Sequence, residues 1–467
     1  MSLEVITTIS PINNKPVLTR HGLSDVDLKT LPVTARNAFL KFRTTTLTER
    51  QRIVGKALEL LEERKDVLGK ELTEQMGRPI AYTAKEITTA VARGRYLWKI
   101  SGDALKDTDG EPEKGFKRHI RRVPVGPVLI IFAWNYPYLI LVNSLIPALL
   151  AGNTVILKPS PQTPTIAEHF HDIFLAAGLP EHVIQLFHCG SPSILETVVR
   201  SPEIKLICFT GSVAGGLSVQ RAAADRFVPI GLELGGKDPA YVRADVDLKW
   251  AAEEIVDGAI FNSGQSCCSI ERVYVDQTIH DAFVGAVQEV LKGYRLGDPF
   301  NSQTQIGPVV SKRSAATIQS HIDDALKKGA QDMTPHNDSF MTPPPEGNFV
   351  APTLLIDVTH DMLIVTDETF GPVIPVMKVA TDAEAVDRMN DSEFGLTASI
   401  WTKNIVRGEM LAAQVEAGTV FVNRCDFPSP DLAWTGWKKS GKGVTLSRFG
   451  FDQFVKLKSF HVKEHPQ

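Results

Sequence analysis

The chain has 467 residues, of which 43% are hydrophobic and 22% are charged, and its formal net charge at pH 7 is −4. This mixture excludes a disordered or fibrous chain, and the balanced charge does not favour nucleic acid or an anionic membrane as a partner. The N-terminal segment has no apolar stretch of signal-peptide length, and the five cysteines show no paired C-x-x-C spacing. We therefore expect a cytoplasmic protein without a disulfide framework or a bound metal.

The first half of the chain predicts a run of helices followed by alternating strands and helices. Residues 46–106 carry apolar residues at helical intervals, and Gly77 and Pro79 end the first helical stretch. Continuous apolar runs then predict strands buried on both faces at 128–133, 154–160, 183–189 and 206–212. Helices are expected at 165–177, at 192–200 and from about residue 217 onward. This alternation predicts an α/β fold built on a doubly wound parallel sheet.

The second half predicts another α/β lobe from about residue 238 onward. Helices are expected at 279–294 and 314–329, and strands at 272–276 and near Leu354, Val373 and Ser399. The basic, alternating segments 118–126 and 454–463 predict β ribbons, either as arms that add to the sheet of another subunit or as charged edge strands within one subunit. Residues 339–347 are expected to form a surface loop.

Two adjacent cysteines, Cys267 and Cys268, follow the sequence NSGQS at a predicted turn between a helix and a strand. A cysteine at such a turn lies close to backbone N–H donors, which lower the pKa of its thiol and make the thiolate a usable nucleophile. The alternative is a small, inert, buried cysteine. The motif alone does not decide between these two interpretations.

Glu233 lies in the apolar segment VPIGLELGG, where burial raises the pKa of a carboxyl group toward neutrality. A carboxylate with such a pKa acts as a general base near pH 7. The alternative is a structural glutamate that is paired with a lysine or with backbone N–H groups.

Two further motifs follow predicted strands. Asn135 comes after the apolar run 128–133, where its amide either reaches the crevice in which open α/β sheets bind ligands or forms an ordinary turn. An amide donor in that crevice stabilises a developing oxyanion. The segment CFTGSVAGG runs from a strand through a Gly-rich turn into a helix whose first N–H groups are suited to a pyrophosphate, although it lacks the G-x-G-x-x-G fingerprint.

Seven motifs in order, AWNYP, LKPSPQTP, FTGS, LELGGK, NSGQSCC, ETFGPV and WKKSGKG, resemble the aldehyde dehydrogenase superfamily over nearly the whole chain. The resemblance implies an NAD(P)-dependent, non-acylating enzyme that oxidises an aldehyde to a carboxylic acid. It implies that the Cys267 thiolate forms a thiohemiacetal, whose oxyanion is held by the Asn135 side chain and the backbone N–H of Cys267. A hydride then passes to the nicotinamide, and Glu233 activates the water that hydrolyses the resulting thioester.

The resemblance also implies a domain organisation. Residues 1–105 and 126–233 are expected to form a dinucleotide-binding domain, residues 234–440 a catalytic domain, and residues 106–125 and 441–467 β arms for oligomerisation. Because two such arms suit subunit exchange, we expect a homodimer, with a homotetramer built as a dimer of dimers as the larger alternative.

The residues that the resemblance implies as contacts of NADP or NAD are Trp134, Lys158, Ser160, Pro161, Gly211, Ser212, Gly215, Leu234, Gly235, Glu368 and Phe370. Those expected to line the substrate pocket are Tyr136, Ile140, Asn143, Phe261, Ser266, Cys268, Arg424 and Phe427. Many NAD-preferring relatives have a glutamate where this chain has Pro161. Because that glutamate repels a 2′-phosphate, its absence predicts the use of NADP, with NAD as the alternative.

The substrate is expected to be an aromatic or medium-chain aliphatic aldehyde, because the predicted pocket walls, which mix apolar and polar groups, have an aromatic and aliphatic share. The alternative is a carboxylate-bearing semialdehyde that pairs with Arg424, unless the nearby Asp426 neutralises that arginine. Three other activities compete with this hypothesis: acyl transfer to coenzyme A, a cysteine hydrolase, and a non-catalytic binding role. Glu233 opposes transfer to coenzyme A, because a base that activates water favours hydrolysis. No histidine lies in a nucleophile motif, which opposes a cysteine hydrolase. The complete set of Asn135, Glu233 and Cys267 opposes a non-catalytic role.

Overall fold

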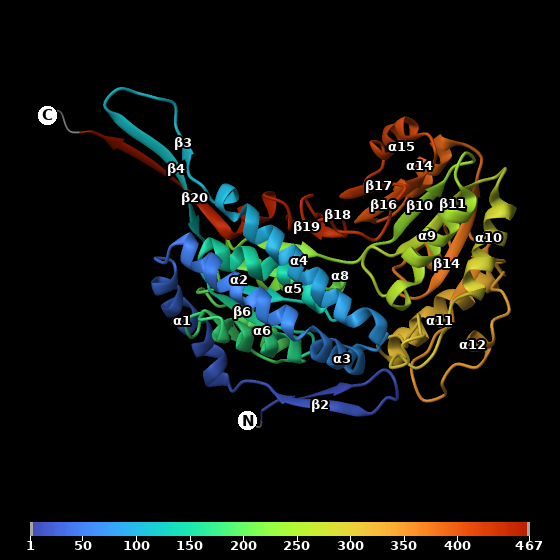
Figure 1. Ribbon diagram of the computed structural model, residues 1–467, viewed down its shortest axis with the longest axis horizontal. Helices are drawn as coiled ribbons and strands as arrows, with labels where there is room; N and C mark the ends of the chain where they lie inside the picture. The colour runs from blue at the N-terminus through green and yellow to red at the C-terminus, as the bar shows by residue number, and fades with distance from the viewer. Residues whose placement is uncertain (1–2, 465–467) are drawn as a thin grey trace.

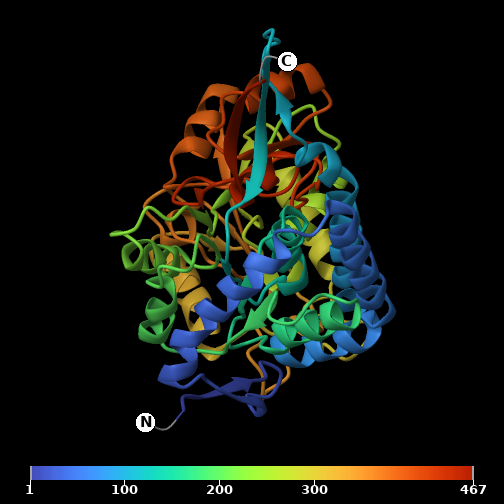
Figure 2. The same ribbon diagram turned by 90° about the vertical axis from the view of Figure 1, so that its left-hand side faces the viewer.

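The computed structural model describes residues 3–464, so residues 1–2 of the predicted first domain and residues 465–467 of the second predicted arm lie outside the described residues. Two α/β lobes lie side by side, the first coloured mainly blue to green and the second mainly yellow to red (Figure 1). A narrow β arm extends from the body of the molecule (Figure 2). Among the described residues, no helix combines the length and the apolar character needed to cross a membrane.

The first lobe contains a six-stranded sheet, formed in spatial order by β19 (Gly441–Lys442), β9 (Ile230–Glu233), β8 (Leu206–Thr210), β5 (Val128–Ile131), β6 (Val155–Lys158) and β7 (Ile184–Leu186). The strands from β9 to β7 are parallel, and β19 pairs antiparallel with β9 from the far end of the chain. This arrangement confirms the doubly wound parallel sheet, whose strand order reverses between β5 and β8. Each strand is shorter than its apolar run predicts, because the end residues of the run pass into turns.

The helices of this lobe are α1 (Asp25–Phe42), α2 (Leu47–Glu63), α3 (Lys65–Met76), α4 (Ile80–Ala104), α5 (Pro137–Ala151), α6 (Thr165–Ala176), α7 (Pro192–Val199) and α8 (Val213–Ala222). Their ends follow from local chemistry. The Thr46 and Ser212 side chains cap α2 and α8 by accepting backbone N–H bonds, and Gly77 ends α3 with a φ of +83°. Because Ser212 caps it, α8 begins before the predicted start near residue 217, and two glycines are accommodated within its first turns.

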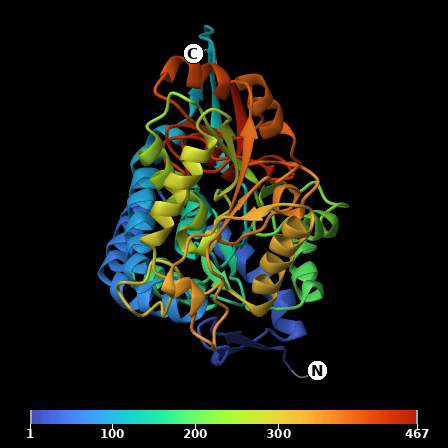
Figure 3. The ribbon, with the colours of Figure 1, turned by 90° about the vertical axis from the view of Figure 1, so that its right-hand side faces the viewer.

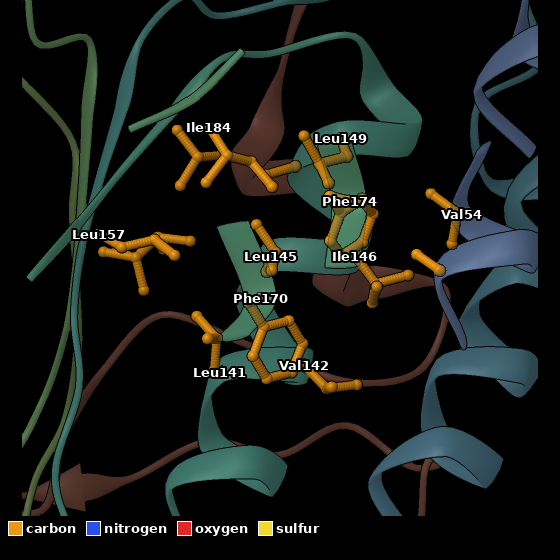
Figure 4. Packing of buried hydrophobic residues seen from close by; sticks show 14 of the residues in the cluster. Val54, Leu141, Val142, Leu145, Ile146, Leu149, Leu157, Phe170, Phe174 and Ile184 are labelled. Carbon is orange, nitrogen blue, oxygen red and sulfur yellow. The ribbon is translucent and has the colours of Figure 1, made fainter. Parts of the chain in front are cut away.

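Helix α5 forms the centre of the first hydrophobic core. It is apolar on nearly all sides, and nearly all of its residues are buried. Figure 4 shows Leu145 and Ile146 of α5 between Leu157 of the sheet and Val54 of α2. This packing fixes the turn between β5 and α5, which contains Asn135.

The second lobe contains a seven-stranded sheet, in spatial order β12 (Gln331–Asp332), β13 (Thr353–Ile356), β14 (Val373–Val379), β11 (Ile270–Asp276), β10 (Asp238–Val242), β16 (Thr397–Trp401) and β17 (Thr419–Val422). All neighbouring strands are parallel except β12 and β13. Its helices, many of them seen in Figure 3, are α9 (Leu248–Ile260), α10 (His280–Lys292), α11 (Lys312–Lys327), α12 (Asp338–Met341), α13 (Leu363–Thr366), α14 (Asp382–Asn390) and α15 (Ile405–Ala412). The second α/β lobe is therefore confirmed, but the predicted loop at 339–347 begins inside the one-turn helix α12.

The arm is a three-stranded antiparallel sheet of β20 (Val455–Lys463), β4 (Phe116–Pro124) and β3 (Thr108–Asp109). The two predicted ribbons pair with each other along the full length of β20 and β4. Addition of this arm to another subunit stays a prediction.

Several short elements were not predicted from the sequence. An N-terminal hairpin joins β1 (Val5–Ile9) to β2 (Pro16–His21), and β15 (Phe394–Gly395) pairs with β18 (Trp437–Lys438). Two 3₁₀ segments, η1 (Phe261–Gly264) and η2 (Phe449–Phe454), complete the described fold.

The packing of α5 in the first hydrophobic core leads to a prediction about stability. Leu145 is 0% exposed, so Leu145→Ala removes buried methyl groups and leaves a cavity. We expect it to lower the free energy of unfolding by about 2–5 kcal/mol, measured by urea denaturation followed by circular dichroism. The matched control is Leu40→Ala on α1, where the side chain is 41% exposed and the expected change is within about 0.5 kcal/mol. Equal effects of the two substitutions would contradict the packing described for α5.

Candidate active site

Several predicted functional residues follow the carboxyl ends of parallel strands in the first sheet. They are Asn135 after β5, Lys158 at the end of β6, Ser212 after β8 and Glu233 at the end of β9. Because these strands are parallel, their carboxyl ends meet at one edge of the sheet, on both sides of the switch point between β5 and β8. The sheet therefore gathers residues that are far apart in the sequence.

Cys267 lies in the turn that joins α9 to β11 in the second lobe, and its thiol is half-buried. We call residues 261–269 the cysteine turn. Its backbone has positive φ angles of +53°, +58° and +71° at Asn262, Ser263 and Gly264. Left-handed backbone is costly for residues with a side chain, so this turn depends on contacts with its surroundings. One such contact is the Ser263 hydroxyl, which donates to the Gly307 carbonyl oxygen at 2.9 Å.

A buried polar network connects the cysteine turn to Asn135. Arg78, between α3 and α4, donates from Nε to Asn262 Oδ1 at 3.0 Å and from Nη2 to the backbone carbonyl of Asn135. The Asn135 side-chain amide donates to the Gln265 carbonyl oxygen at 3.2 Å. Glu86 pairs with Arg78, so the buried guanidinium has a counter-charge. The Asn135 amide is thus held against the backbone of Gln265, which lies two residues before the predicted nucleophile Cys267.

Glu233 is held by two hydroxyl groups at the end of β9. Thr445 donates to Oε1, and Thr210 donates to Oε2 at 3.3 Å. Burial raises the pKa of Glu233 above its ordinary value, as predicted, although these hydroxyls oppose the shift. The backbone beyond Glu233 packs on the cysteine turn, because a Cβ on Gly236 would lie 2.5 Å from the Cys267 carbonyl oxygen. The three predicted catalytic residues therefore lie around one turn.

A pocket of about 310 Å³ lies between α7 and α8, at the carboxyl end of β6. Lys158 and Gly215 line it, and burial lowers the pKa of Lys158. Ser212 caps α8 at the edge of this pocket by accepting the Gly215 N–H at 3.2 Å. A concave pocket beside a helix N-terminus and a lysine fits the adenosine and pyrophosphate parts of a dinucleotide.

A second group of predicted cofactor residues lies beside the cysteine turn. Trp134 and Phe370 contact edge to face, with their ring centroids 5.8 Å apart. Glu368 accepts the Gly236 N–H at 3.2 Å, and a Cβ on Gly235 would clash with the Glu368 carboxyl group. Burial raises the pKa of Glu368 to about 8. A carboxyl group that is protonated near neutral pH both donates and accepts hydrogen bonds, which suits a ribose hydroxyl.

The remaining predicted cofactor residues contact neighbouring protein groups. The Gly211 N–H bonds the end of β9, and Leu234 packs against α8. The Ser160 hydroxyl accepts a backbone N–H in the turn after β6, and the Pro161 carbonyl accepts the Thr8 hydroxyl at 2.7 Å. These residues shape the sheet edge and do not line the pocket between α7 and α8.

Part of the predicted substrate pocket gathers at the cysteine turn. The Ser266 hydroxyl and the Cys268 thiol both donate to Asp426 Oδ1 at 2.9 Å. The Tyr136 ring lies against the Arg78 guanidinium, 4.1 Å from its carbon, and Ile140 follows one turn later on α5.

Other predicted pocket residues lie elsewhere. Arg424 is exposed and stacks on Phe427, with 3.6 Å from the guanidinium carbon to the ring centroid. Phe261 packs edge-on against Tyr82, with ring centroids 5.1 Å apart, and lines a separate pocket next to α9 and α10. Asp426, the alternative partner considered for Arg424, accepts hydrogen bonds from the cysteine turn.

Arg93 was not among the predicted site residues. It lies on α4 with only 6% of its surface exposed, and its guanidinium donates to Asn143 Oδ1 at 2.9 Å. Glu86 and Arg93 share one helix face with Ala90 and other buried apolar residues. Charged residues at core spacing are the signal in the sequence from which Arg93 could have been found.

The half-buried Asp426 side chain leads to a prediction about the pH dependence of stability. Burial raises its pKa to about 6. Because this folded-state pKa lies above the unfolded value, the stabilising effect of the bound proton is lost as the pH rises through about 6. Asp426→Asn keeps the Oδ1 acceptor and removes the buried charge, so its gain in melting temperature over wild type is expected to be larger at about pH 8 than at about pH 5. A gain that does not change with pH would contradict the burial of this charge.

Comparison with known proteins gives one consistent family. The aldehyde dehydrogenase family model matches residues 1–460. An NADP(+) succinate-semialdehyde dehydrogenase of Mycolicibacterium paratuberculosis is 32% identical, over 98% of this chain and 96% of its own length. A betaine aldehyde dehydrogenase of Sinorhizobium fredii is 33% identical, over 98% of this chain and 94% of its own length.

Solved structures agree with the sequence comparison. The NADP-dependent glyceraldehyde-3-phosphate dehydrogenase from Bacillus halodurans C-125, crystallised with NADP, is 32% identical with a TM-score of 0.92, over 99% of this chain and 96% of that one. The predicted fold class is therefore confirmed. This chain belongs to the aldehyde dehydrogenase family and is an NAD(P)-dependent aldehyde dehydrogenase.

Proposed function

We propose that this chain oxidises an aldehyde to a carboxylic acid by covalent catalysis at Cys267, without passing the acyl group to coenzyme A. The observation that supports the proposal is the convergence of a free thiol, a buried amide and a half-buried carboxyl group on the cysteine turn. The Asn135 amide bonds the turn, and the backbone after Glu233 packs against Cys267. A nucleophile, an oxyanion donor and a general base are the groups that oxidation through a thioester requires.

In the first half-reaction, the Cys267 sulfur bonds to the aldehyde carbon, and the carbonyl oxygen becomes an oxyanion. The donors proposed to hold this oxyanion are the Asn135 side-chain amide and the Cys267 backbone N–H. Removing one such donor costs about 2.7–4 kcal/mol of transition-state stabilisation. Arg78 and Gln265 hold Asn135, so its amide is oriented before the substrate binds. The nicotinamide cofactor, when bound, supplies the acceptor for the hydride that leaves the substrate carbon.

In the second half-reaction, Glu233 takes a proton from water while the water oxygen bonds to the thioester carbon. The Cys267 thiolate then leaves, and the carboxylic acid is released. Burial raises the pKa of Glu233 and so brings its basicity closer to the operating pH. Because a positioned base favours attack by water, Glu233 supports hydrolysis over transfer to coenzyme A.

The surroundings of Lys158 support the use of NADP⁺ as well as NAD⁺. Pro161 offers no carboxylate to repel a 2′-phosphate. Another carboxylate lies nearby, because Glu4 accepts the N–H of the pocket residue Gly190 at 3.1 Å and its charge acts on Lys158. A carboxylate at this position repels a 2′-phosphate. We therefore expect Glu4 to weaken the preference for NADP⁺ that the absence of a carboxylate at Pro161 allows.

Two substrate classes are supported by different observations. Tyr136 and Ile140 provide apolar surface at the start of α5, which supports an aromatic or medium-chain aliphatic aldehyde. The buried Arg93 supports a carboxylate-bearing semialdehyde. Arg424, the arginine expected from the sequence to bind such a carboxylate, lies at the surface instead.

We also propose a cytoplasmic homodimer, with a homotetramer as the larger alternative. The arm projects from the body of the molecule, and β20 lies at one edge of its sheet (Figure 2). Leu457 and Val462 on β20 are 67% and 46% exposed, so a partner subunit would cover apolar surface there.

The catalytic assignment predicts two different defects. Cys267→Ala removes the nucleophile, so formation of reduced nicotinamide is expected to fall below detection with every aldehyde. Glu233→Gln retains acylation but lacks the base, so stopped-flow absorbance is expected to show one turnover followed by a steady state slower by about 10²–10⁴-fold. The control is Cys425→Ala, because the Cys425 thiol lies beside the Glu254 carbonyl of α9. Normal turnover by Cys267→Ala would refute the assignment of the nucleophile.

Cofactor choice is tested by binding as well as by turnover. The Kd values for NADP⁺ and NAD⁺ are measured by quenching of protein fluorescence, and kcat/KM is compared for the two cofactors. Glu4→Gln removes a negative charge beside the pocket and is expected to favour NADP⁺ by about two- to fivefold over wild type. Glu49→Gln, on the exposed start of α2, is the matched control. A strong NAD⁺ preference that persists in Glu4→Gln would refute the interpretation of Pro161.

A further inference from the structure

Arg93 carries a buried charge that is bonded only to neutral acceptors. Its Nη1 donates to Asn143 Oδ1 at 2.9 Å, and its Nη2 donates to the Pro428 carbonyl oxygen at 3.1 Å. Its Nε is buried and has no hydrogen-bond acceptor among the described residues. A buried donor without an acceptor is costly, which indicates that a ligand completes this site.

Two of the other buried cations are paired with carboxylates, and a third, Arg272, has neutral acceptors on all three guanidinium nitrogens. Arg78 pairs with Glu86, and Lys237 pairs with Glu271 at 2.6 Å. A buried charge without such a partner is destabilising. Arg93 differs from Arg78 and Lys237 because it has no carboxylate partner, and from Arg272 because its Nε has no acceptor among the described residues. Both differences favour an anionic ligand.

Arg93 also lies close to the reacting groups. Burial lowers the pKa of Arg93 to about 10, so it stays charged near neutral pH, and the charges of Glu233, Cys268, Glu86 and Cys267 oppose this shift. Among the described residues, the Glu233 carboxyl group accepts hydrogen bonds from Thr445 and Thr210 and none from Arg93. Of the two acceptors that fix the guanidinium, Asn143 was predicted to line the substrate pocket, and Pro428 lies two residues after Asp426, which bonds the cysteine turn.

We propose that Arg93 binds the carboxylate of a semialdehyde whose aldehyde carbon reacts at Cys267, an inference that rests on the proposed function. The planar guanidinium has five N–H donors and binds a carboxylate through two of them at once. Asn143 and Pro428 orient it without neutralising it. Arg93 bonds Pro428, and the cysteine turn bonds Asp426 two residues earlier, so we expect the carboxylate and the aldehyde to be separated by only a few carbon atoms.

Asp426 gives the pocket a second, opposite charge. It accepts hydrogen bonds from Ser266 and Cys268, which flank Cys267. An ionised Asp426 repels a substrate carboxylate from this wall. The two charged residues therefore orient the substrate with its carboxylate toward Arg93.

The first test compares two aldehydes of similar length, succinic semialdehyde and pentanal. For wild type, kcat/KM is expected to be higher with succinic semialdehyde. Arg93→Met is expected to lower the ratio of the two kcat/KM values by about 10- to 100-fold, and Arg93→Lys to restore part of it. Arg95→Met, on the exposed face of the same helix, is the matched control and is expected to keep the ratio. Thermal melting establishes that each variant is folded.

Several outcomes of this test overturn the proposal. They are an unchanged ratio in Arg93→Met, an equal loss with both aldehydes, and a loss of the ratio in Arg424→Met instead. A larger loss with glyceraldehyde 3-phosphate than with succinic semialdehyde assigns Arg93 to a phosphate and overturns the carboxylate assignment. If wild type reduces neither cofactor with any aldehyde, the proposed function fails.

The second test needs no turnover and separates substrate binding from activation of the thiol. Glutarate is expected to protect wild-type Cys267 from alkylation by iodoacetamide, and this protection is expected to be lost in Arg93→Met. The pH profile of alkylation without glutarate is expected to be the same in both proteins. A shifted profile with unchanged protection would assign Arg93 to positioning the thiolate and overturn its role in binding the carboxylate.

Discussion

The hydrogen bonds of Arg78 across the boundary between the two lobes are the interaction on which the site depends. This guanidinium bonds the Asn262 side chain in the second lobe and the Asn135 carbonyl in the first. Its pairing with Glu86 compensates the buried charge, and Glu86 also accepts the Tyr138 N–H at the start of α5 at 3.0 Å. One buried network thus sets where an amide of one lobe meets the cysteine turn of the other.

The same constraint explains how a costly backbone conformation persists. Asn262 and Ser263 both have positive φ, and each is tied to distant segments through its side chain. Such strain is kept only where the surrounding structure holds it in place. The result is a turn that brings Cys267 against Gly236, just beyond the carboxyl group of Glu233.

Much of the fold could be predicted because its signals are local. The strands of the first sheet and helices such as α6, α7, α10 and α11 follow from apolar periodicity within each segment. The two residues of β19 carry no such signal, yet Gly441 pairs with Glu233 across more than two hundred residues of sequence. The N-terminal hairpin was missed for a similar reason, because its short strands are mostly exposed.

The candidate site shows the same division between local and tertiary information. Motifs located Cys267, Glu233 and Asn135, and the burial of Glu233 followed from its apolar neighbours. Arg424 was predicted to line the substrate pocket because of its position in the sequence. Its stacking on Phe427 is a tertiary contact that the sequence does not reveal. The burial of Arg93 likewise depends on packing between α4, α5 and the segment around Pro428.

The position of the covalent intermediate tests most directly whether Cys267 is the nucleophile. Glu233→Gln protein is mixed with an aldehyde and the cofactor, quenched in acid, digested, and analysed by peptide mass spectrometry. An added acyl group is expected on Cys267 and none on the adjacent Cys268. An acyl group on another residue, or product formed with no acylated peptide, would contradict it.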